Sequence, residues 1–338
     1  MHGVYMKRRK ALYLLVILAT LISALISAEE KRYYWSIDNS VGITYGHARE
    51  LVYQYTGSKD LLSELVWPLE GLVYYGTALH YNYGNRPYTG FYGNISVRFG
   101  FYMQSGTMTD KDWLNADANG YFLTNFSAHE AISENSQWLD TTIGYGFSLT
   151  PSLILRTGIT ASVMNLHWIA RNGYTQYGPN TGTDTTVYIP WSSSFPKELV
   201  YGTGIGYWQN WVSIAPIVEL RWQALPGLSL QTGTAVYLLN SCNDQDDHYY
   251  PDPNTGLPRQ FTEKMAGGIG FEPTIGTTYN LGANLSLGLE VSWRFITGLR
   301  GNTTIMYIGP GYTYGPYADT AGADYSVARL ALVLTAQY

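Results

Sequence analysis

Residues 285–295 of the 338-residue chain read LSLGLEVSWRF, and this stretch decides the fold. Apolar side chains occupy every second position from Leu285 to Phe295, and small or charged side chains occupy the positions between them. Strict alternation of this kind indicates a β-strand with one apolar and one polar face. The same alternation recurs over residues 139–149, 212–222 and 228–238.

About ten segments of this kind follow one another along the chain. They lie near residues 38–54, 62–77, 90–105, 136–149, 153–172, 201–222, 227–241, 262–279, 283–298 and 322–338. Each is long enough for a tilted strand to cross a bilayer core, which takes roughly 9 to 11 residues. The short links are residues 150–152, 224–227 and 281–283, and the longer polar stretches lie near 106–135, 173–200, 242–261 and 299–321. Short turns at one end and long loops at the other are typical of bacterial outer-membrane barrels.

The sequence therefore predicts an all-β fold, a ten-stranded antiparallel transmembrane β-barrel with long extracellular loops. A barrel closes because no backbone donor or acceptor can stay unpaired in lipid. The composition fits, since only 13% of residues are charged, against about a quarter in soluble domains, and 31 residues are Tyr. A soluble β-sandwich or lipocalin-like barrel is the alternative, and it predicts mostly short loops and a buried apolar face. A helical membrane protein and a disulfide scaffold are excluded, because no long apolar span follows the N-terminus and Cys242 is the only cysteine.

The N-terminus reads as an export signal. Four basic residues at 7–10 precede the apolar run 11–28, and two glutamates follow it. We predict a signal peptide over residues 1–28 and a barrel over residues 29–338, located in the cell outer membrane; an uncleaved anchor is the alternative. The net charge of −5 and the lack of clustered Lys and Arg argue against a nucleic-acid partner.

Two polar clusters stand out from the predicted loops. Asp110 and Asp112 lie just beyond the third predicted strand, and two carboxylates at i and i+2 point to one face, where they can share a proton or hold a polarised water. Asp246 and His248 lie just beyond the seventh, in the spacing that suits a carboxylate orienting an imidazole base. By strand count both clusters leave the barrel on the long-loop side, so they can face one another across its mouth.

Each cluster also has a plainer interpretation. An Asp-x-Asp pair in a loop is most often turn chemistry or a weak divalent-cation site. A histidine among acids without a second His or Cys is a poor zinc site, so we predict no metal and no cofactor. The motifs of serine hydrolases, zinc proteases and phosphate loops are missing from the sequence. Cys242 near His248 is a candidate thiol nucleophile, but a lone Cys without an arranged base is usually inert.

The two clusters, their order and their strand contexts resemble the omptin family of outer-membrane aspartyl-type proteases. The similar segments are residues 40–53, 108–113, 244–249 and 301–304, which span nearly the whole mature chain. The resemblance implies a ten-stranded barrel that projects well above the membrane, with the site in a groove at its outer rim, facing the extracellular side.

The resemblance assigns roles to single residues. It implies that Asp110 and Asp112 are the family's aspartate pair and that Asp246 and His248 are its Asp-His dyad. A water between the two pairs would attack the scissile carbonyl without a covalent intermediate. Glu50 and Asp244 match the acidic residues at the base of the pocket for the residue before the cut. Paired carboxylates select Arg or Lys, so the expected substrates are polypeptides cut after a basic residue. Without the resemblance, Glu50 is an inward-facing charge in a polar lumen.

The chain departs from the family at two places. The acidic residue that favours a second basic side chain after the cut would fall near Thr124 or Asn125, and neither is charged. The strand that binds lipopolysaccharide in enterobacterial members corresponds to residues 161–165, which lack the aromatic, acidic and basic groups involved. We therefore expect contact with outer-membrane lipid, no dependence on lipopolysaccharide, and a monomer.

Two other functions stay open on the sequence alone. The first is a small-solute channel, although a barrel of about ten strands has a filled interior. The second is a catalytically weak or inactive barrel that acts as an adhesin or surface-binding protein.

Overall fold

The computed structural model describes residues 33–54, 60–117, 120–177, 189–251 and 255–338. The predicted signal peptide, residues 1–28, lies outside these ranges. The strands are β1 (Tyr33–Tyr53), β2 (Leu61–Pro68), β3 (Val73–Tyr83), β4 (Gly90–Gly100), β5 (Met103–Asp112), β6 (Asn115–Asp117), β7 (Gly120–Phe122), β8 (Asn125–Ser148), β9 (Leu153–Tyr177), β10 (Glu198–Leu199), β11 (Thr203–Leu225), β12 (Leu228–Tyr237), β13 (Leu239–His248), β14 (Arg259–Asn280), β15 (Leu285–Tyr307) and β16 (Thr313–Gln337). Within the described ranges there is no helix long and apolar enough to span a membrane.

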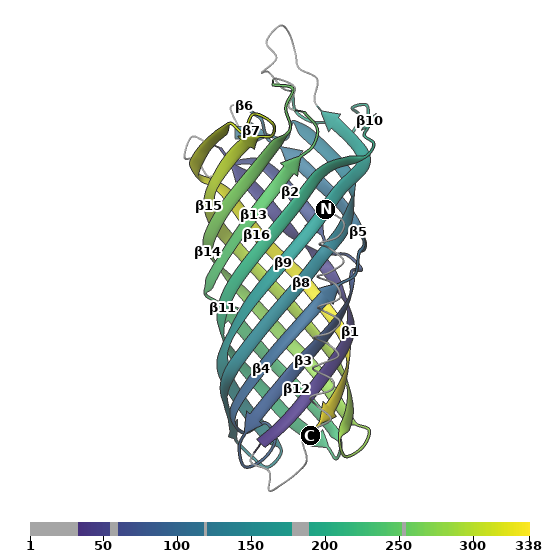
Figure 1. The fold of residues 1–338 in the computed structure, drawn as a ribbon, viewed down its shortest axis with the longest axis vertical. Coiled ribbons are helices and arrows are strands. Elements are labelled where there is room, and N and C mark those ends of the chain that lie inside the picture. The colour runs from purple at the N-terminus through teal and green to yellow at the C-terminus, as the bar shows by residue number, and fades with distance from the viewer. Residues whose placement is uncertain (1–32, 55–59, 118–119, 178–188, 252–254) are drawn as a thin grey trace.

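The strands form a closed antiparallel ring, as predicted. β1 pairs with β16, from Ser36 opposite Gln337 to Val52 opposite Ala321, and β8 pairs with β9 on the other side. Three barrel strands are each built from two segments: β3 with β2, β4 with β5, and β12 with β13. Three short segments lie outside the ring: β6 and β7 pair only with each other, and β10 pairs only with β9. Counting each two-segment strand once, the other thirteen segments give the ten strands of the ring, whose arrangement can be followed in Figure 1.

The outer face of the barrel carries the apolar half of the alternation. Leu289, Val291 and Trp293 are 46%, 41% and 50% exposed, whereas Ser292 and Arg294 between and beside them are each 3% exposed. Exposed apolar side chains form a band around the ring, because the neighbouring strands place Leu, Ile, Val and Phe side chains outward at matching registers. A soluble barrel would bury this face, so the band marks where the lipid lies.

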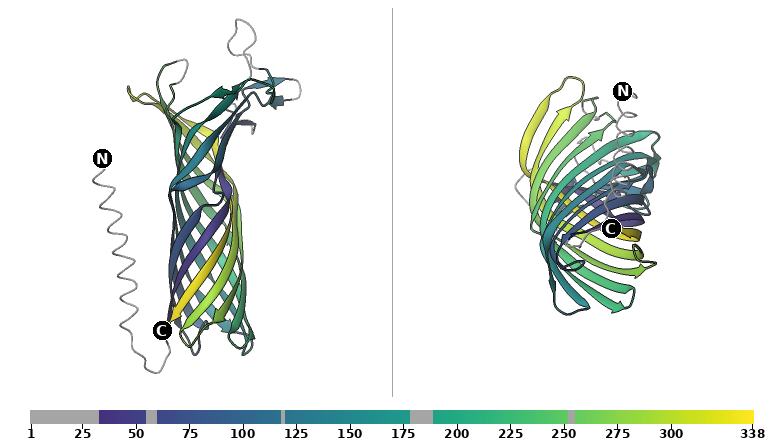
Figure 2. Two further views of the ribbon diagram at one scale, coloured as in Figure 1. Left: turned by 90° about the vertical axis from the view of Figure 1, so that its right-hand side faces the viewer. Right: turned by 60° about the horizontal axis from the view of Figure 1, so that its bottom comes forward.

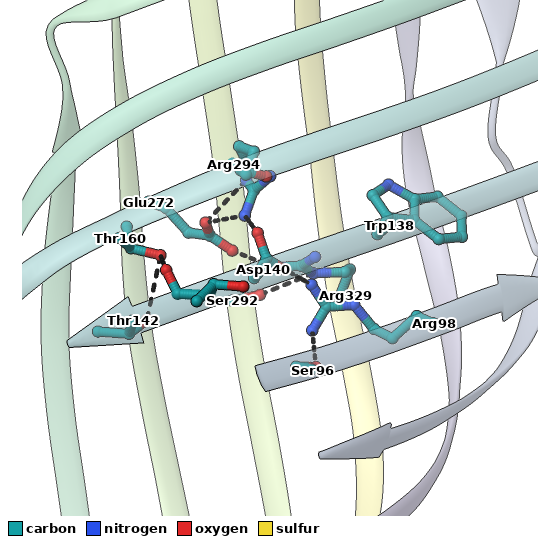
Figure 3. A network of polar contacts seen from close by, with 12 residues as sticks. Ser96, Arg98, Trp138, Asp140, Thr142, Thr160, Glu272, Ser292, Arg294 and Arg329 are labelled. Carbon is teal, nitrogen blue, oxygen red and sulfur yellow. Dashed lines mark hydrogen bonds and ion pairs between the residues drawn. The ribbon is translucent and has the colours of Figure 1, made fainter. Parts of the chain in front are cut away.

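At the level of the apolar band the lumen is lined by paired charges (Figure 3). Arg294 contacts Asp140 at 2.9 Å and Glu272 at 2.7 Å, and Arg329 pairs with the other oxygen of Glu272. Arg98 adds a third guanidinium beside Asp140. Each buried carboxylate here therefore has cationic partners supplied by the protein, which is the condition under which buried charges are tolerated.

The two-segment strands break near the upper limit of the apolar band. In the strand formed by β12 and β13, Leu230, Thr232 and Thr234 point outward, as do the consecutive residues Leu238 and Leu239, which are 54% and 64% exposed. Two successive outward residues reverse the alternation, so even-numbered residues face the lumen throughout β13. An irregularity of this kind re-aims side chains, and such features are common next to active sites.

The strands extend further than the sequence predicted. Residues 108–112 and 244–248 were expected in loops, but they belong to β5 and β13 and pair with neighbours on both sides. Much of the predicted loop sequence at 106–135, 242–261 and 299–321 is likewise strand. The apolar signal ends at the membrane surface because the outward positions above it meet water, whereas the backbone pairing continues. At the top the strands splay into two groups, the yellow-green strands on one side and the blue-teal strands on the other (Figure 2).

We expect Arg294→Met to lower the free energy of unfolding by about 3–5 kcal/mol, because Glu272 and Asp140 lose a buried partner. The control Arg171→Met removes an exposed ion pair with Glu130 and should cost less than about 1 kcal/mol. Urea titration of the protein folded in detergent micelles, followed by tryptophan fluorescence, measures both. Similar effects of the two substitutions would contradict the stabilising role of the lumen network.

Candidate active site

The candidate residues lie above the apolar band, toward the splayed end of the barrel. On β1 the outward side chains are Val41, Ile43 and Tyr45, which are 40% or more exposed, and further along the same face Arg49 takes part in ion pairs. Glu50 is the next residue. On β13 the apolar outward face ends at Leu239, five residues before Asp244. The site is therefore outside the lipid-facing segment of each strand.

Asp246 and His248 form a hydrogen-bonded pair on the inner face of β13. The distance from His248 Nε2 to Asp246 Oδ2 is 2.7 Å. Asp246 is buried at 2% exposure, whereas the side chain of His248 is 27% exposed. Phe261 on the neighbouring strand β14 packs edge-on against the imidazole, with ring centroids 5.2 Å apart. The carboxylate fixes the ring through Nε2, so Nδ1 is the nitrogen that remains to accept a proton.

Asp110 and Asp112 point inward from β5, each beside a polar partner. Ser63 on β2 donates a hydrogen bond to Asp110 Oδ1 at 3.3 Å, and Asn125 Nδ2 donates to Asp112 Oδ2 at 3.5 Å. Burial raises the pKa of Asp110 well above its usual range, and the charges of Asp112 and Asp246 raise it further. Burial also raises the pKa of Asp112, which the hydrogen bonds and the positive charge of a protonated His248 offset in part.

The two pairs, far apart in sequence, face one another across the lumen. The charge on Asp246 acts on Asp110, and that on His248 acts on Asp112. A hydrogen bond spans the interior at this level, since Gln209 Nε2 on β11 donates to the backbone oxygen of Arg49 on β1 at 3.4 Å. The structure thus brings together the four residues singled out by their i, i+2 spacing.

Three more carboxylates lie beside the pairs. Glu50 on β1, Asp244 on β13 and Glu263 on β14 are 2%, 3% and 0% exposed. Burial raises the pKa of all three, to about 8 for Asp244, and repulsion among these acids and Asp246 raises the pKa values further. Glu263 was not singled out in the sequence, where it is an ordinary residue at the start of a predicted strand.

A layer of aromatic side chains lies next to the carboxylates. Trp67 on β2 stacks on Tyr207 of β11 with ring centroids 4.8 Å apart, and Trp168 of β9 completes the group. The Tyr207 hydroxyl donates to Asp244 Oδ2 at 2.9 Å, and Gln209 Nε2 lies 2.7 Å from the Tyr207 oxygen. Through this contact the apolar layer fixes the position of one carboxylate.

The other sequence candidates have different roles. Cys242 is fully buried, and burial raises the pKa of its thiol well above the usual range, so the thiol stays protonated and is a poor nucleophile. Thr124 and Asn125 both bond to Asp112, through its backbone and its carboxylate respectively. Among the described residues, no group of three or more His, Cys, Asp or Glu side chains is arranged to hold a metal ion.

The ring and the site define a class of protein: a β-barrel of the outer membrane that carries a carboxylate and imidazole site above the lipid. The sequence model of the omptin family matches residues 31–338, nearly all of the chain. The chain belongs to the omptin family, and it is an outer-membrane protease. No curated protein matches it in sequence.

One solved structure agrees with the fold over nearly its whole length. The crystal structure of the outer membrane protease OmpT from Escherichia coli matches with a TM-score of 0.79 at 16% identity, covering 92% of this chain and 99% of that one. The Pseudomonas putida toluene transporter TodX matches at a TM-score of 0.31 and 9% identity, over 91% of this chain and 90% of the transporter. The translocator domain of NalP from Neisseria meningitidis reaches 0.30 at 8% identity, over 97% and 96%. The last two scores are too low to support any argument.

We expect the protein to lose stability as the pH rises from about 4 to 8. An aspartate in an unfolded chain has a pKa of about 3.9, whereas the folded chain raises the pKa of Asp244 to about 8. The folded state therefore holds a proton that the unfolded state has released, and the free energy of unfolding falls by about 1.4 kcal/mol per pH unit for one such group.

Asp244→Asn should reduce this slope, because the amide does not titrate. Urea unfolding in micelles at pH 5 and pH 8.5 measures it. The control is Asp247→Asn, which changes an outward-facing carboxylate of the same strand, bonded to Gln245 and Gln260. A wild-type slope in the Asp244→Asn protein would show that this carboxyl does not hold a proton in the folded state.

Proposed function

We propose that the chain is an endopeptidase that hydrolyses peptide bonds after Arg or Lys, using Asp110, Asp112, Asp246 and His248. The observation that supports this most directly is the 2.7 Å hydrogen bond between Asp246 and His248 on the inner face of β13, at a level where Asp110 and Asp112 point into the same lumen from β5. A single water between an acidic pair and an Asp-His pair has both a base to remove its proton and carboxyl groups to orient it. No metal or cofactor takes part in the proposed reaction.

The proposed reaction begins with a water positioned between His248 and Asp110. His248, held through Nε2 by Asp246, accepts a proton at Nδ1, and the resulting hydroxide forms a bond to the scissile carbonyl carbon. The proton shared by Asp110 and Asp112 stabilises the oxyanion of the tetrahedral species. Return of the proton from His248 to the leaving nitrogen allows the carbon–nitrogen bond to break, without a covalent enzyme intermediate.

A basic side chain before the cut would supply a positive charge beside Glu50 and Asp244. The charged groups acting on Glu50 are Asp246, Glu263, Asp244 and Asp110, all of them acidic. Within the described part of the chain, Glu50 Oε2 and Asp244 Oδ1 are buried without a hydrogen-bond partner. A guanidinium or ammonium group offers several charged donors at once, which suits unpaired carboxylate oxygens.

The turns of the barrel and the outward residues of β9 support a proposal for the side of the membrane on which the site lies and for its need of lipid. Short turns lie at the end of the barrel opposite the site, as at residues 149–152 and 226–227, and in outer-membrane barrels such turns face the periplasm. We therefore propose that the site opens to the exterior, where polypeptides reach it. Over residues 161–165 the outward positions of β9 hold Ala161, Val163 and Asn165 and carry no charge, which supports activity without lipopolysaccharide bound there. We also propose that the protein acts as a monomer.

The first test replaces the proposed catalytic groups. We expect His248→Asn and Asp110→Asn to lower kcat by about 10²- to 10⁴-fold with little change in KM. The first removes the proposed base, the second removes a carboxyl group that orients the water and stabilises the oxyanion, and neither removes a group that binds the substrate side chain. The assay is turnover of a quenched peptide with a central Arg by protein refolded in detergent. Asp247→Asn is the matched control, since its side chain lies between those of Asp246 and His248 in sequence but faces outward. Equal turnover in all variants would refute these roles and favour a binding function for the barrel.

The second test concerns the residue before the cut. We expect wild-type protein to prefer an Arg peptide over the same peptide with citrulline, which has nearly the same shape and no charge. Glu50→Gln should lower kcat/KM for the Arg peptide by about 10-fold or more and leave the citrulline peptide nearly unaffected. A wild-type protein that cleaves both peptides equally would contradict the proposed basic specificity.

A further inference from the structure

We infer that Glu263 is a third carboxylate of the site that receives the basic side chain, and that it strengthens selection of a guanidinium or ammonium group. The inference rests on the proposed function and adds a residue to it. Glu50 and Asp244 come from the family resemblance, whereas Glu263 is identified by its surroundings in the structure.

The position of Glu263 is fixed by strand register. It lies on β14 directly opposite Asp244 of β13 and, on the other side, opposite Thr303 of β15. Its side chain points into the lumen and is completely buried. The negative charge of Glu263 acts on Glu50, which projects from β1, and on Tyr207, which projects from β11. Glu263 therefore faces the same space as the two expected pocket residues.

The two oxygens of Glu263 have different partners. Oε1 accepts a hydrogen bond of 2.7 Å from Thr303 Oγ1, and the Thr320 hydroxyl lies 3.0 Å from that same Oγ1. Oε2 is buried and has no hydrogen-bond partner among the residues that the structure describes. The hydroxyls thus hold the carboxyl group in place while one oxygen remains available to an incoming donor. A buried acceptor without a partner is costly, so a ligand that donates to it gains affinity.

A second glutamate on the same strand shows what is missing at Glu263. Glu272, nine residues later on β14, is also buried, and it pairs with both Arg294 and Arg329. The charged groups that act on Glu263 are Asp244 and Asp246, both acidic. Lys264, its neighbour in sequence, is exposed and points out of the barrel. The protein compensates one buried glutamate with its own arginines, whereas the charged groups that act on the other are acids, as expected where the cation belongs to a substrate.

The test compares Glu263→Gln with wild type on the Arg and citrulline peptides. The amide keeps the size of the side chain and an acceptor for Thr303, so the substitution removes the charge and the acceptor at the position of Oε2. We expect kcat/KM for the Arg peptide to fall about 10- to 100-fold and that for the citrulline peptide to stay within about 2-fold. Glu64→Gln is the control, because Glu64 pairs with Arg49 and Lys111 instead of facing the carboxylates, and it should leave both peptides unaffected.

The outcomes separate this inference from the proposed function. If Glu50→Gln loses the preference for Arg and Glu263→Gln keeps it, the inference is wrong and the proposed function stands. If Glu263→Gln lowers turnover of both peptides equally, Glu263 has a structural role and the inference is again wrong. If wild type does not distinguish the peptides, the proposed specificity itself fails. At pH 8 we also expect Glu263→Gln to unfold at a higher temperature than wild type, and a lower temperature would contradict an uncompensated charge.

Discussion

The structure depends on the pairing of its first and last strands. β1 and β16 are hydrogen-bonded along most of their length, which leaves no free sheet edge at the level of the lipid. Closure forces every residue of a strand to face either the lipid or the lumen. The apolar band and the interior charges are therefore two halves of one alternation, as in Trp293 and Arg294. Above the band the same pairing continues into water, and it holds β5 and β13 at fixed positions around the mouth.

The barrel contains two groups of buried carboxylates, one with arginine partners and one that faces other acids. In the lower group, Asp140 and Glu272 have arginine partners. In the upper group, Glu50, Asp244 and Glu263 repel one another and their pKa values are raised. A protein selected for stability alone would pair or remove such charges. The presence of uncompensated carboxylates next to the Asp-His pair is the physical reason for regarding the upper group as a binding site.

The sequence predicts the ring because each strand that crosses the lipid must by itself alternate apolar and polar residues. The alternation at 285–295 and the short turn at 150–152 are local features, and both are confirmed. The i, i+2 spacing also identifies Asp246 and His248, because their geometry depends on one strand only. Glu263 and Ser63 have no such local signal. Their importance comes from register between strands that are distant in sequence, and the upper limits of the strands were missed because the apolar pattern ends at the membrane surface.

The break at Leu238 and Leu239 shows why extrapolating a strand is unsafe. Continued without interruption, the alternation through Leu230 and Thr232 would turn Asp246 and His248 toward the outside. One additional outward residue reverses the phase of all that follows. The phase of a barrel strand can thus be set independently for its lipid-embedded half and its water-exposed half. An evolving barrel is then free to exchange the chemistry at its mouth while the sequence that anchors it in the bilayer stays the same.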